Sequence, residues 1–166
     1  MITLRERVPS VSHVDGELEL PFDLRQKSRL LTALSSGEAV GLMLDRGTVL
    51  RGGDCLCADD GRIVRVVAAD EALMEARCGD AVCLARCAYH LGNRHTPVQV
   101  GAGWLRFAAD DVLAGMARSV GATVTPISAP FEPEAGAYAG GHHHHSSDAK
   151  HGGIIHDMAA RVRATS

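Results

Sequence analysis

Short runs of alternating polar and apolar residues, or of β-branched residues, fill the first 70 positions of the chain. The runs expected to be strands are Met1–Leu4, Glu17–Leu20, Glu38–Leu42, Thr48–Leu50 and Arg62–Ala68. Pairs that favour turns separate these runs, namely Asp15-Gly16, Arg46-Gly47, Gly52-Gly53 and Asp60-Gly61. The stretch Asp23–Leu34 fits a helix or, because much of it is polar, a solvated loop. Short strands with closely spaced turns predict a small β-rich domain over residues 1–70, either a barrel or a sandwich.

The pattern changes after residue 70, where two helical segments alternate with strands. The first helix has Asp80 as its expected N-cap and Gly92 as the left-handed residue that ends it. The second helix has Asp110 and Asp111 in its first turn, Arg118 in its last turn and Gly121 after its end. The expected strands are Ala72–Arg77, Val98–Val100, Trp104–Phe107 and Thr123–Ile127. The fold class is therefore α+β, and residues 71–138 are expected to form a ferredoxin-like βαββαβ domain with two helices on one face of an antiparallel sheet.

Histidine is concentrated at the end of the chain, where large apolar residues become rare. Such a segment cannot bury enough apolar surface to offset the entropy lost on ordering, so residues 139–166 are expected to be a flexible His-rich tail. Its histidines are His142, His143, His144, His145, His151 and His156. Imidazole is a good ligand for Ni(II), Zn(II) and Cu(II), and affinity alone favours Cu(II). The tail predicts metal binding without selecting the metal; a purification tag and a low-complexity linker are the alternatives.

Composition and charge exclude several classes of protein. The formal net charge is −3 and no cluster of Lys and Arg stands out, so nucleic-acid binding is not expected. No apolar run approaches the roughly 18 residues of a membrane span, and the first residues lack the apolar segment of a signal peptide. The five cysteines are then expected to be reduced thiols of a soluble, cytoplasmic protein.

The connector around His95 is the most informative stretch. Pro97 biases Thr96 towards extended backbone, so His95 is expected on a short surface loop between the first helix and the next strand. A single loop histidine is more often solvated than a ligand, because Ni(II) and Zn(II) take four or more donors. A symmetric dimer that brings two copies of His95 together would double the number of donors, and tail histidines could complete the set.

Several motifs resemble the urease accessory protein UreE family. They are His90-Leu91-Gly92-Asn93-Arg94-His95-x-Pro97, Asp23-Leu24-Arg25-Gln26-Lys27-Ser28-Arg29, Gly47-x-x-Leu50-Arg51-x-Gly53-Asp54 and Pro130-Phe131-x-Pro133-Glu134-x-Gly136-Ala137-Tyr138. The motifs occur in the expected order and span nearly the whole chain up to the tail, which makes the likeness far more specific than any one of them.

The resemblance implies a homodimeric nickel metallochaperone rather than an enzyme. Each subunit would pair a β-rich, peptide-binding-like N-terminal domain with a ferredoxin-like metal-binding domain. Members of the family deliver Ni(II) to apo-urease together with other accessory proteins, including a GTPase. The dimer-interface nickel ligand of the family maps onto His95, and His90 is a weaker candidate that can equally be a packed helix-end histidine. Trp104 and Arg106 stand where some relatives carry extra histidines, so those accessory sites are expected to be missing. Zn(II) or Cu(II) is expected to compete with Ni(II) in vitro.

Two further groups have both a structural and a functional interpretation. Cys83, Cys87 and His90 share one helix face and could form a soft-metal site, but core packing of the cysteines is favoured because free cysteine is usually buried. Cys55 and Cys57 would face opposite sides of a strand, which disfavours chelation. The basic residues Arg25, Lys27 and Arg29 are a solvated face or, if the family likeness holds, a docking patch for an acidic partner.

Two other functions compete with that of a nickel carrier. A metal-dependent hydrolase would need a recognisable motif such as H-E-x-x-H, and the chain has none, nor a phosphate-binding loop or a serine nucleophile elbow. A peptide-binding chaperone whose tail only stores metal would be consistent with the β-rich first domain.

Overall fold

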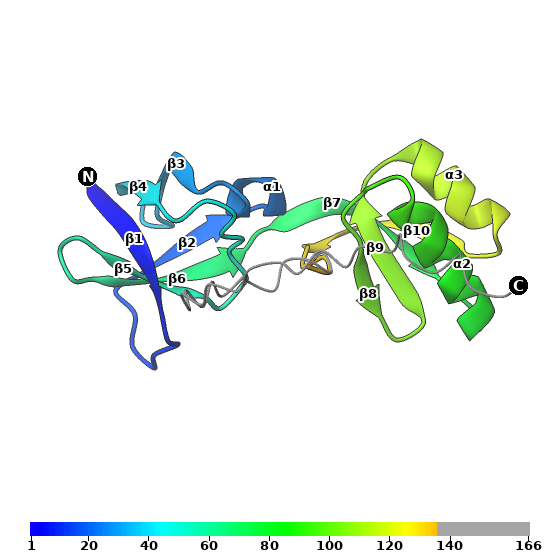
Figure 1. Cartoon of the computed structure of the whole chain (residues 1–166), viewed down its shortest axis with the longest axis horizontal. Helices are drawn as coiled ribbons and strands as arrows, with labels where there is room; N and C mark the ends of the chain where they lie inside the picture. Colours follow the sequence, from blue (N-terminus) through cyan, green and yellow to red (C-terminus); the bar gives the residue numbers. More distant parts are fainter. Residues whose placement is uncertain (136–166) are drawn as a thin grey trace, which may run out of the picture. The chain divides into compact units, whose positions relative to one another are not determined.

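The computed structural model describes residues 1–135, whose elements are labelled in Figure 1. The first part of the chain forms one six-stranded sheet and a single helical turn, α1 (Phe22–Arg25). Its strands are β1 (Ile2–Val8), β2 (Gly16–Leu20), β3 (Arg29–Ala33), β4 (Ala39–Met43), β5 (Cys55–Ala58) and β6 (Ile63–Ala68). They pair in the order β2-β6-β5-β1-β4-β3; β1–β4 and β2–β6 are parallel and the other pairs antiparallel. The β-rich character expected from the alternating pattern is confirmed.

Leucine and valine side chains form the core of this sheet, as the scarcity of aromatic residues requires. The fully buried members include Leu4, Leu18, Val40, Leu50, Leu56 and Val66. Each such side chain stabilises the fold by roughly 1.5–3 kcal/mol relative to its exposed state. Three of the four expected turns have a glycine with positive φ, at Gly47, Gly53 and Gly61, whereas Gly16 begins β2.

Several elements predicted from the polar and apolar pattern of residues 1–70 differ from those in the structure. The expected strand at Thr48–Leu50 is wrong, because the N–H of Leu50 donates to the carbonyl of Arg25 at 2.9 Å and not to a neighbouring strand. Strand β3 occupies part of the stretch considered as helix or loop; it lies at the sheet edge and leaves Leu31 exposed. Strand β5 is mostly buried, so it lacks the alternation by which a strand is recognised.

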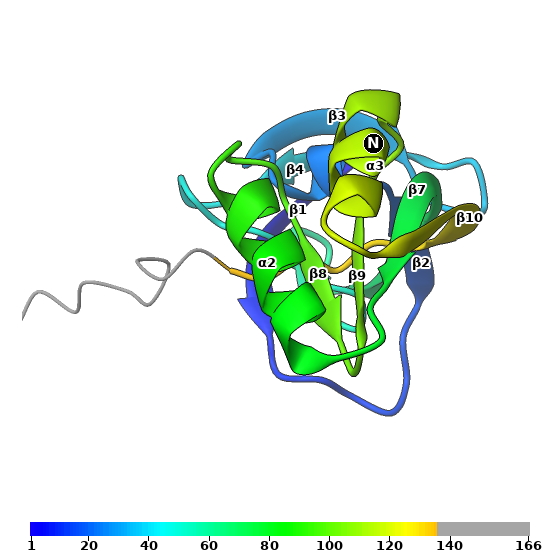
Figure 2. The ribbon, with the colours of Figure 1, turned by 90° about the vertical axis from the view of Figure 1, so that its right-hand side faces the viewer.

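The second part of the chain has the expected order of strand, helix, strand, strand, helix, strand. The elements are β7 (Asp70–Arg77), α2 (Ala81–Gly92), β8 (Gln99–Gly101), β9 (Trp104–Ala108), α3 (Asp111–Ser119) and β10 (Thr123–Pro130). The strands form an entirely antiparallel sheet in the order β10-β7-β9-β8. Seen from two directions, α2 and α3 lie on the same side of this sheet (Figures 1 and 2).

The first helix begins where the sequence predicts, whereas Asp110 is the N-cap of the second helix and does not lie in its first turn. The Asp80 carboxylate accepts from the N–H of Cys83, and that of Asp110 accepts from the N–H of Leu113, each at 2.8 Å. Such caps satisfy N–H groups that have no partner within the helix. The core between the helices and the sheet contains Met74, Ala76, Cys83, Cys87, Leu91, Leu105, Phe107, Ala114, Ala117 and Val124. Within residues 1–135, no helix is long and apolar enough to cross a membrane.

Candidate metal centre

His95 is exposed and lies in the turn that follows α2. The N–H of Arg94 donates to the carbonyl of Leu91 at 3.0 Å, and that of His95 donates to the carbonyl of Gly92 at 2.9 Å. The prediction of a left-handed Gly92 is wrong, because Gly92 is still helical. The left-handed position is instead His95, with φ of 54°, the one non-glycine residue with positive φ within residues 1–135.

This backbone conformation of His95 is unfavourable for a residue with a Cβ atom. The cost is roughly 1–2 kcal/mol, and only glycine and a few polar residues adopt it readily. Strained backbone of this kind is concentrated at functional positions. An exposed imidazole on a hydrogen-bonded turn is available to a metal ion that takes its other ligands from elsewhere.

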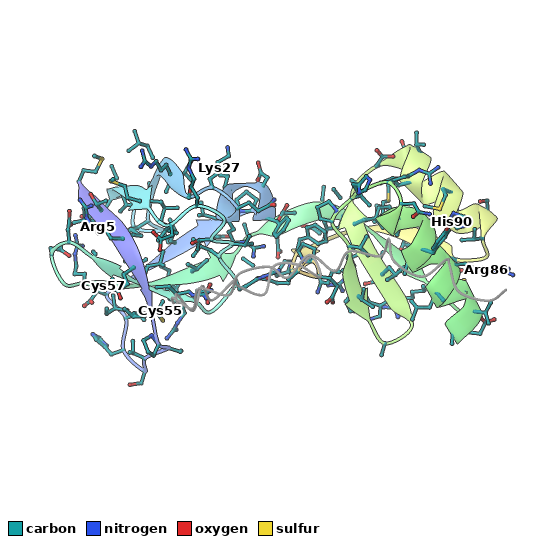
Figure 3. All side chains as sticks on the ribbon, viewed as in Figure 1. Arg5, Lys27, Cys55, Cys57, Arg86 and His90 are labelled. Atoms are coloured by element: carbon teal, nitrogen blue, oxygen red, sulfur yellow. The ribbon has the colours of Figure 1, made fainter. Side chains whose placement is uncertain are left out.

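His90 lies in the last turn of α2 and is half-buried (Figure 3). Its ring packs edge-on against Tyr89, with centroids 5.3 Å apart, and its backbone carbonyl accepts from Arg94 at 3.4 Å. These contacts are typical of a packed helix-end histidine, which is the alternative to a role of His90 as a metal ligand.

A group of three thiols lies beneath α2. The sulfur atoms of Cys78, Cys83 and Cys87 lie within 4.8 Å of one another, and those of Cys78 and Cys87 are 3.9 Å apart. The buried positions of Cys83 and Cys87 confirm core packing. The third member of the cluster is Cys78, just after β7, and not His90 as the helical spacing suggested. That spacing relates only residues of one helix, so it could not identify Cys78.

Burial also determines the protonation of this cluster. Desolvation raises the pKa of the Cys78 thiol to about 12, with contributions from hydrogen bonds to Cys83 and Cys87. Desolvation likewise raises the pKa of the Cys87 thiol. Both are therefore neutral thiols at neutral pH.

The other pair of cysteines lies on β5 of the first sheet (Figure 3). Cys55 is fully buried and Cys57 is half-buried, and all five cysteines of the chain are free. The expectation that the two side chains face opposite sides of the strand is wrong, because residues two positions apart on a strand lie on the same face.

The basic stretch is divided between the core and the surface. Arg25 is fully buried, so its expected part in a docking surface is corrected. Its guanidinium donates to the carbonyls of Leu20 at 3.1 Å, Leu50 at 3.3 Å and Phe131, and to the carboxylate of Glu132 at 2.9 Å. A buried cation needs such partners to offset its desolvation.

Glu132 joins this network to the turn at Arg51 and Gly52. It accepts from Arg51 at 3.1 Å and from the N–H of Gly52 at 2.7 Å. Burial alone would raise the pKa of Glu132, but the hydrogen bond from Gly52 and those from Arg51 and Arg25 outweigh it and lower the pKa.

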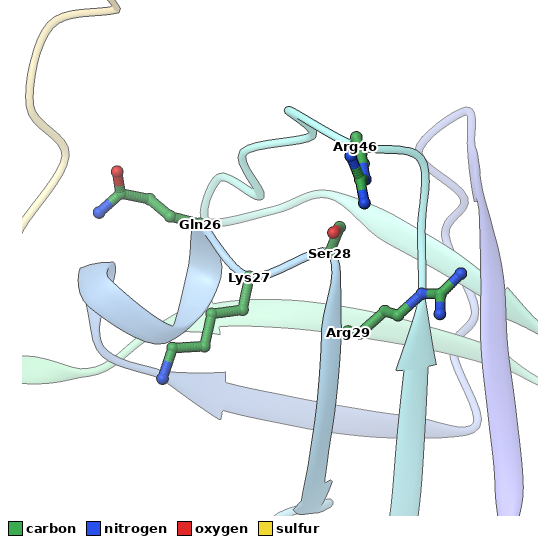
Figure 4. A pocket seen from close by; sticks show the side chains of 5 residues that line it. All are labelled: Gln26, Lys27, Ser28, Arg29 and Arg46. Carbon is green, nitrogen blue, oxygen red and sulfur yellow. The ribbon is translucent and has the colours of Figure 1, made fainter.

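Lys27 and Arg29, in contrast, are exposed. Together with Gln26, Ser28 and Arg46 they line an open surface hollow of about 410 Å³ (Figure 4). Three of the five lining side chains, those of Lys27, Arg29 and Arg46, are cationic.

Trp104 and Arg106 form a structural pair on β9. The Arg106 guanidinium lies 4.4 Å from the centroid of the Trp104 ring and 2.8 Å from the buried carboxylate of Glu75. The two side chains thus make a cation–π contact and an ion pair at positions where some relatives are expected to carry histidines. The tail histidines expected to bind metal, from His142 to His156, lie outside the described residues.

These observations define a class of protein: a two-domain, sheet-rich α+β chain with an exposed, strained histidine after its second helix. Two family models match the chain in this arrangement. The N-terminal domain of UreE urease accessory protein matches residues 4–69, and the C-terminal domain matches residues 71–158. The chain belongs to the UreE urease accessory protein family, which is a family of accessory chaperones and not of enzymes.

Relatives from several bacteria carry the name "Urease accessory protein UreE". The protein of Paraburkholderia xenovorans is 61% identical over 125 residues, 75% of this chain, and the match spans only 56% of that relative's length. The protein of Alkalilimnicola ehrlichii is 53% identical over 140 residues, 84% of this chain and 86% of its own. The protein of Nitrosospira multiformis is 54% identical over 143 residues, 86% of this chain and 81% of its own.

Proposed function

We propose that this chain is a nickel-binding metallochaperone that delivers Ni(II) to apo-urease during assembly of its metallocentre. Membership of a urease accessory family supports the role in urease maturation. The single observation that carries the metal site is the exposed His95, which has left-handed backbone on a hydrogen-bonded turn.

The proposed site lies at the interface of a homodimer, where two copies of His95 share one Ni(II). One imidazole is too few for stable binding, and a two-fold axis doubles the donors without further sequence. The neighbouring surface of α2 supports such an interface. Val82 and Tyr89, seven positions apart on one helix face, are 61% and 66% exposed.

The tail histidines supply the remaining donors in this proposal. His142 to His145, His151 and His156 would bind ions near the interface, and His90 is an auxiliary ligand at most, given its packing against Tyr89. Imidazole donors accept Zn(II) and Cu(II) as well as Ni(II), so both are expected to compete in vitro.

We further propose two domains, residues 1–70 and 71–138, followed by the His-rich tail at residues 139–166. The strand order β10-β7-β9-β8, with both helices on one side, supports a ferredoxin-like second domain. The partners would be apo-urease and the other accessory proteins, including a GTPase, with Lys27 and Arg29 docking an acidic surface. Five free cysteines support a reducing, cytoplasmic setting.

The test is Ni(II) titration by calorimetry on the full chain, on His95→Ala and on a chain that ends at Gly140. His95→Ala should lose the tightest site, one per dimer, while truncation should lower the total number of ions bound. His13→Ala is the matched control, because His13 is exposed on the first domain.

Urease activation by each variant provides the second readout. His95→Ala should activate apo-urease poorly at limiting nickel, and His13→Ala should activate it normally. Wild-type nickel affinity and activation in His95→Ala would overturn the interface site. Full activation by a variant that binds no nickel would favour a peptide-binding chaperone instead.

A further inference from the structure

The three thiols of Cys78, Cys83 and Cys87 come from two separate segments and converge at the start of α2. Cys78 follows β7, Cys83 lies in the first turn of α2, and Cys87 lies one turn further on. The three sulfur atoms are mutually within 4.8 Å, and the Cys78–Cys87 separation is 3.9 Å. Three sulfur ligands at a metal–thiolate bond length of about 2.3 Å, arranged in a plane around one ion, would be about 4 Å apart. The thiols therefore need to move little to share an ion.

Contacts that involve no metal ion hold each of the three cysteines in place. The N–H of Cys78 donates to the carbonyl of Gly103 at 2.9 Å. The N–H of Cys83 donates to the capping carboxylate of Asp80 at 2.8 Å, and the Cys87 thiol lies 3.9 Å from the carbonyl of Ala117. Such preorganisation lowers the entropy that a binding site loses when the ion arrives.

The donor set selects the kind of ion. Within residues 1–135 the cluster consists of thiols alone, without a histidine or carboxylate. Thiolates select soft ions, and Cu(I) accepts three of them, whereas structural Zn(II) sites take four ligands. The first turn of a helix also favours the negative charge that the thiolates bring.

We propose that Cys78, Cys83 and Cys87 bind one Cu(I) ion as a three-sulfur site, separate from the histidines proposed for nickel. Each thiol releases its proton to solvent as its sulfur binds the ion. The site does not depend on nickel delivery, and it would join the end of β7 to α2.

The experiment is a Cu(I) titration of the reduced full chain without oxygen, in competition with a chromophoric Cu(I) chelator. The wild type should hold one tightly bound Cu(I), and Cys78→Ser should weaken that binding by at least about 100-fold, because a hydroxyl is a poor ligand for a soft ion. Cys57→Ser is the matched control, since Cys57 is half-buried but on the first sheet. It should bind Cu(I) like the wild type, and Cys78→Ser should keep wild-type Ni(II) binding.

Alkylation mapping of the wild type tests whether the three cysteines bind Cu(I), even if a serine variant fails to fold. Under partial unfolding, Cu(I) should protect Cys78, Cys83 and Cys87 from iodoacetamide together, and leave Cys57 reactive. Equal Cu(I) affinity in the wild type and a folded Cys78→Ser variant would overturn the proposal. The proposal would also be overturned if Cu(I) did not protect the three cysteines from alkylation, or if the chain bound Zn(II) tightly and showed no detectable Cu(I) binding.

Discussion

The buried guanidinium of Arg25 donates to the carboxylate of Glu132 at 2.9 Å, although the two residues are 107 positions apart. Arg25 has no exposed surface, and its other acceptors are backbone carbonyls. Glu132 is therefore the partner that neutralises its charge. A buried charge left without its counter-ion is one of the costliest defects in a folded chain.

We expect Glu132→Gln to lower the free energy of unfolding by about 2–3 kcal/mol. The amide keeps hydrogen-bonding capacity but no charge, and the remaining carbonyl acceptors of Arg25 limit the loss. Urea denaturation followed by circular dichroism measures the change. Glu134→Gln is the control, because Glu134 is exposed, and it should differ from wild type by less than about 0.5 kcal/mol. Equal effects of the two substitutions would contradict the role given to Glu132.

The same carboxylate predicts part of the acid sensitivity of the chain. The pKa of Glu132 is lower in the folded state than its usual value of 4.5, so the folded state binds fewer protons. Its stabilisation is complete above roughly pH 4.5 and is lost as the pH falls through the lower folded pKa. The difference in unfolding free energy between wild type and Glu132→Gln should therefore stay constant above about pH 4.5 and shrink as the pH falls below it. A difference that stays constant as the pH falls well below 4.5 would contradict the prediction.

The backbone at His95 can be tested separately from its imidazole. We expect His95→Gly to be at least as stable as the wild type, and His95→Val to be less stable than His95→Gly by about 1–2 kcal/mol, because a β-branched residue adopts positive φ poorly. The control is Asn93→Gly in the same turn, where φ is −64° and glycine should cost roughly 0.5–1 kcal/mol. Thermal unfolding of the three variants gives the comparison, and a destabilised His95→Gly would argue against the left-handed conformation.

The features that could be predicted from the sequence are those encoded locally. Asp80 was expected as an N-cap because a capping carboxylate acts on N–H groups three positions away. The helix end was misplaced because Gly92 is a statistical signal for left-handed backbone, whereas Gly92 is still helical and two further residues, Asn93 and Arg94, precede the left-handed His95. The alternating order of strands and helices follows from hydrophobic periodicity, which is also local.

The features that escaped prediction depend on contacts between distant segments. Arg25 belongs to a run of polar residues, and its burial depends on acceptors from distant segments, the carbonyl of Leu50 and the carboxylate of Glu132 among them. Cys78 lies in the turn between β7 and α2, and this turn brings its thiol close to those of Cys83 and Cys87. Helical spacing cannot predict this, because Cys78 is not part of the helix. The candidate nickel ligand His95 was predicted from a family motif, and the structure adds its exposure and its backbone conformation.

A close contact between Gly101 and Trp104 predicts a strong effect of a small substitution. A Cβ atom at Gly101 would lie 2.1 Å from the Trp104 ring, so Gly101→Ala must displace the ring from its contact with Arg106. We expect a loss of about 1–3 kcal/mol and a changed fluorescence spectrum of the single tryptophan. Gly115→Ala on α3 is the matched control. It meets no atom within 4 Å, and it should stabilise the helix by roughly 0.5–1 kcal/mol. Equal stability of the two variants would show that the ring adapts freely.

The basic hollow at Lys27 gives the last prediction. If Lys27 and Arg29 dock an acidic surface of apo-urease or an accessory protein, Lys27→Glu should weaken that association about tenfold at low salt, mainly through the association rate. The effect should diminish at high salt, where surface charges are screened. Arg5→Glu provides the same change of charge at an exposed position on β1, outside the residues that line the hollow (Figure 3). Surface plasmon resonance against the immobilised partner measures both rates. If Arg5→Glu weakens binding as much as Lys27→Glu, net charge rather than the hollow determines the association.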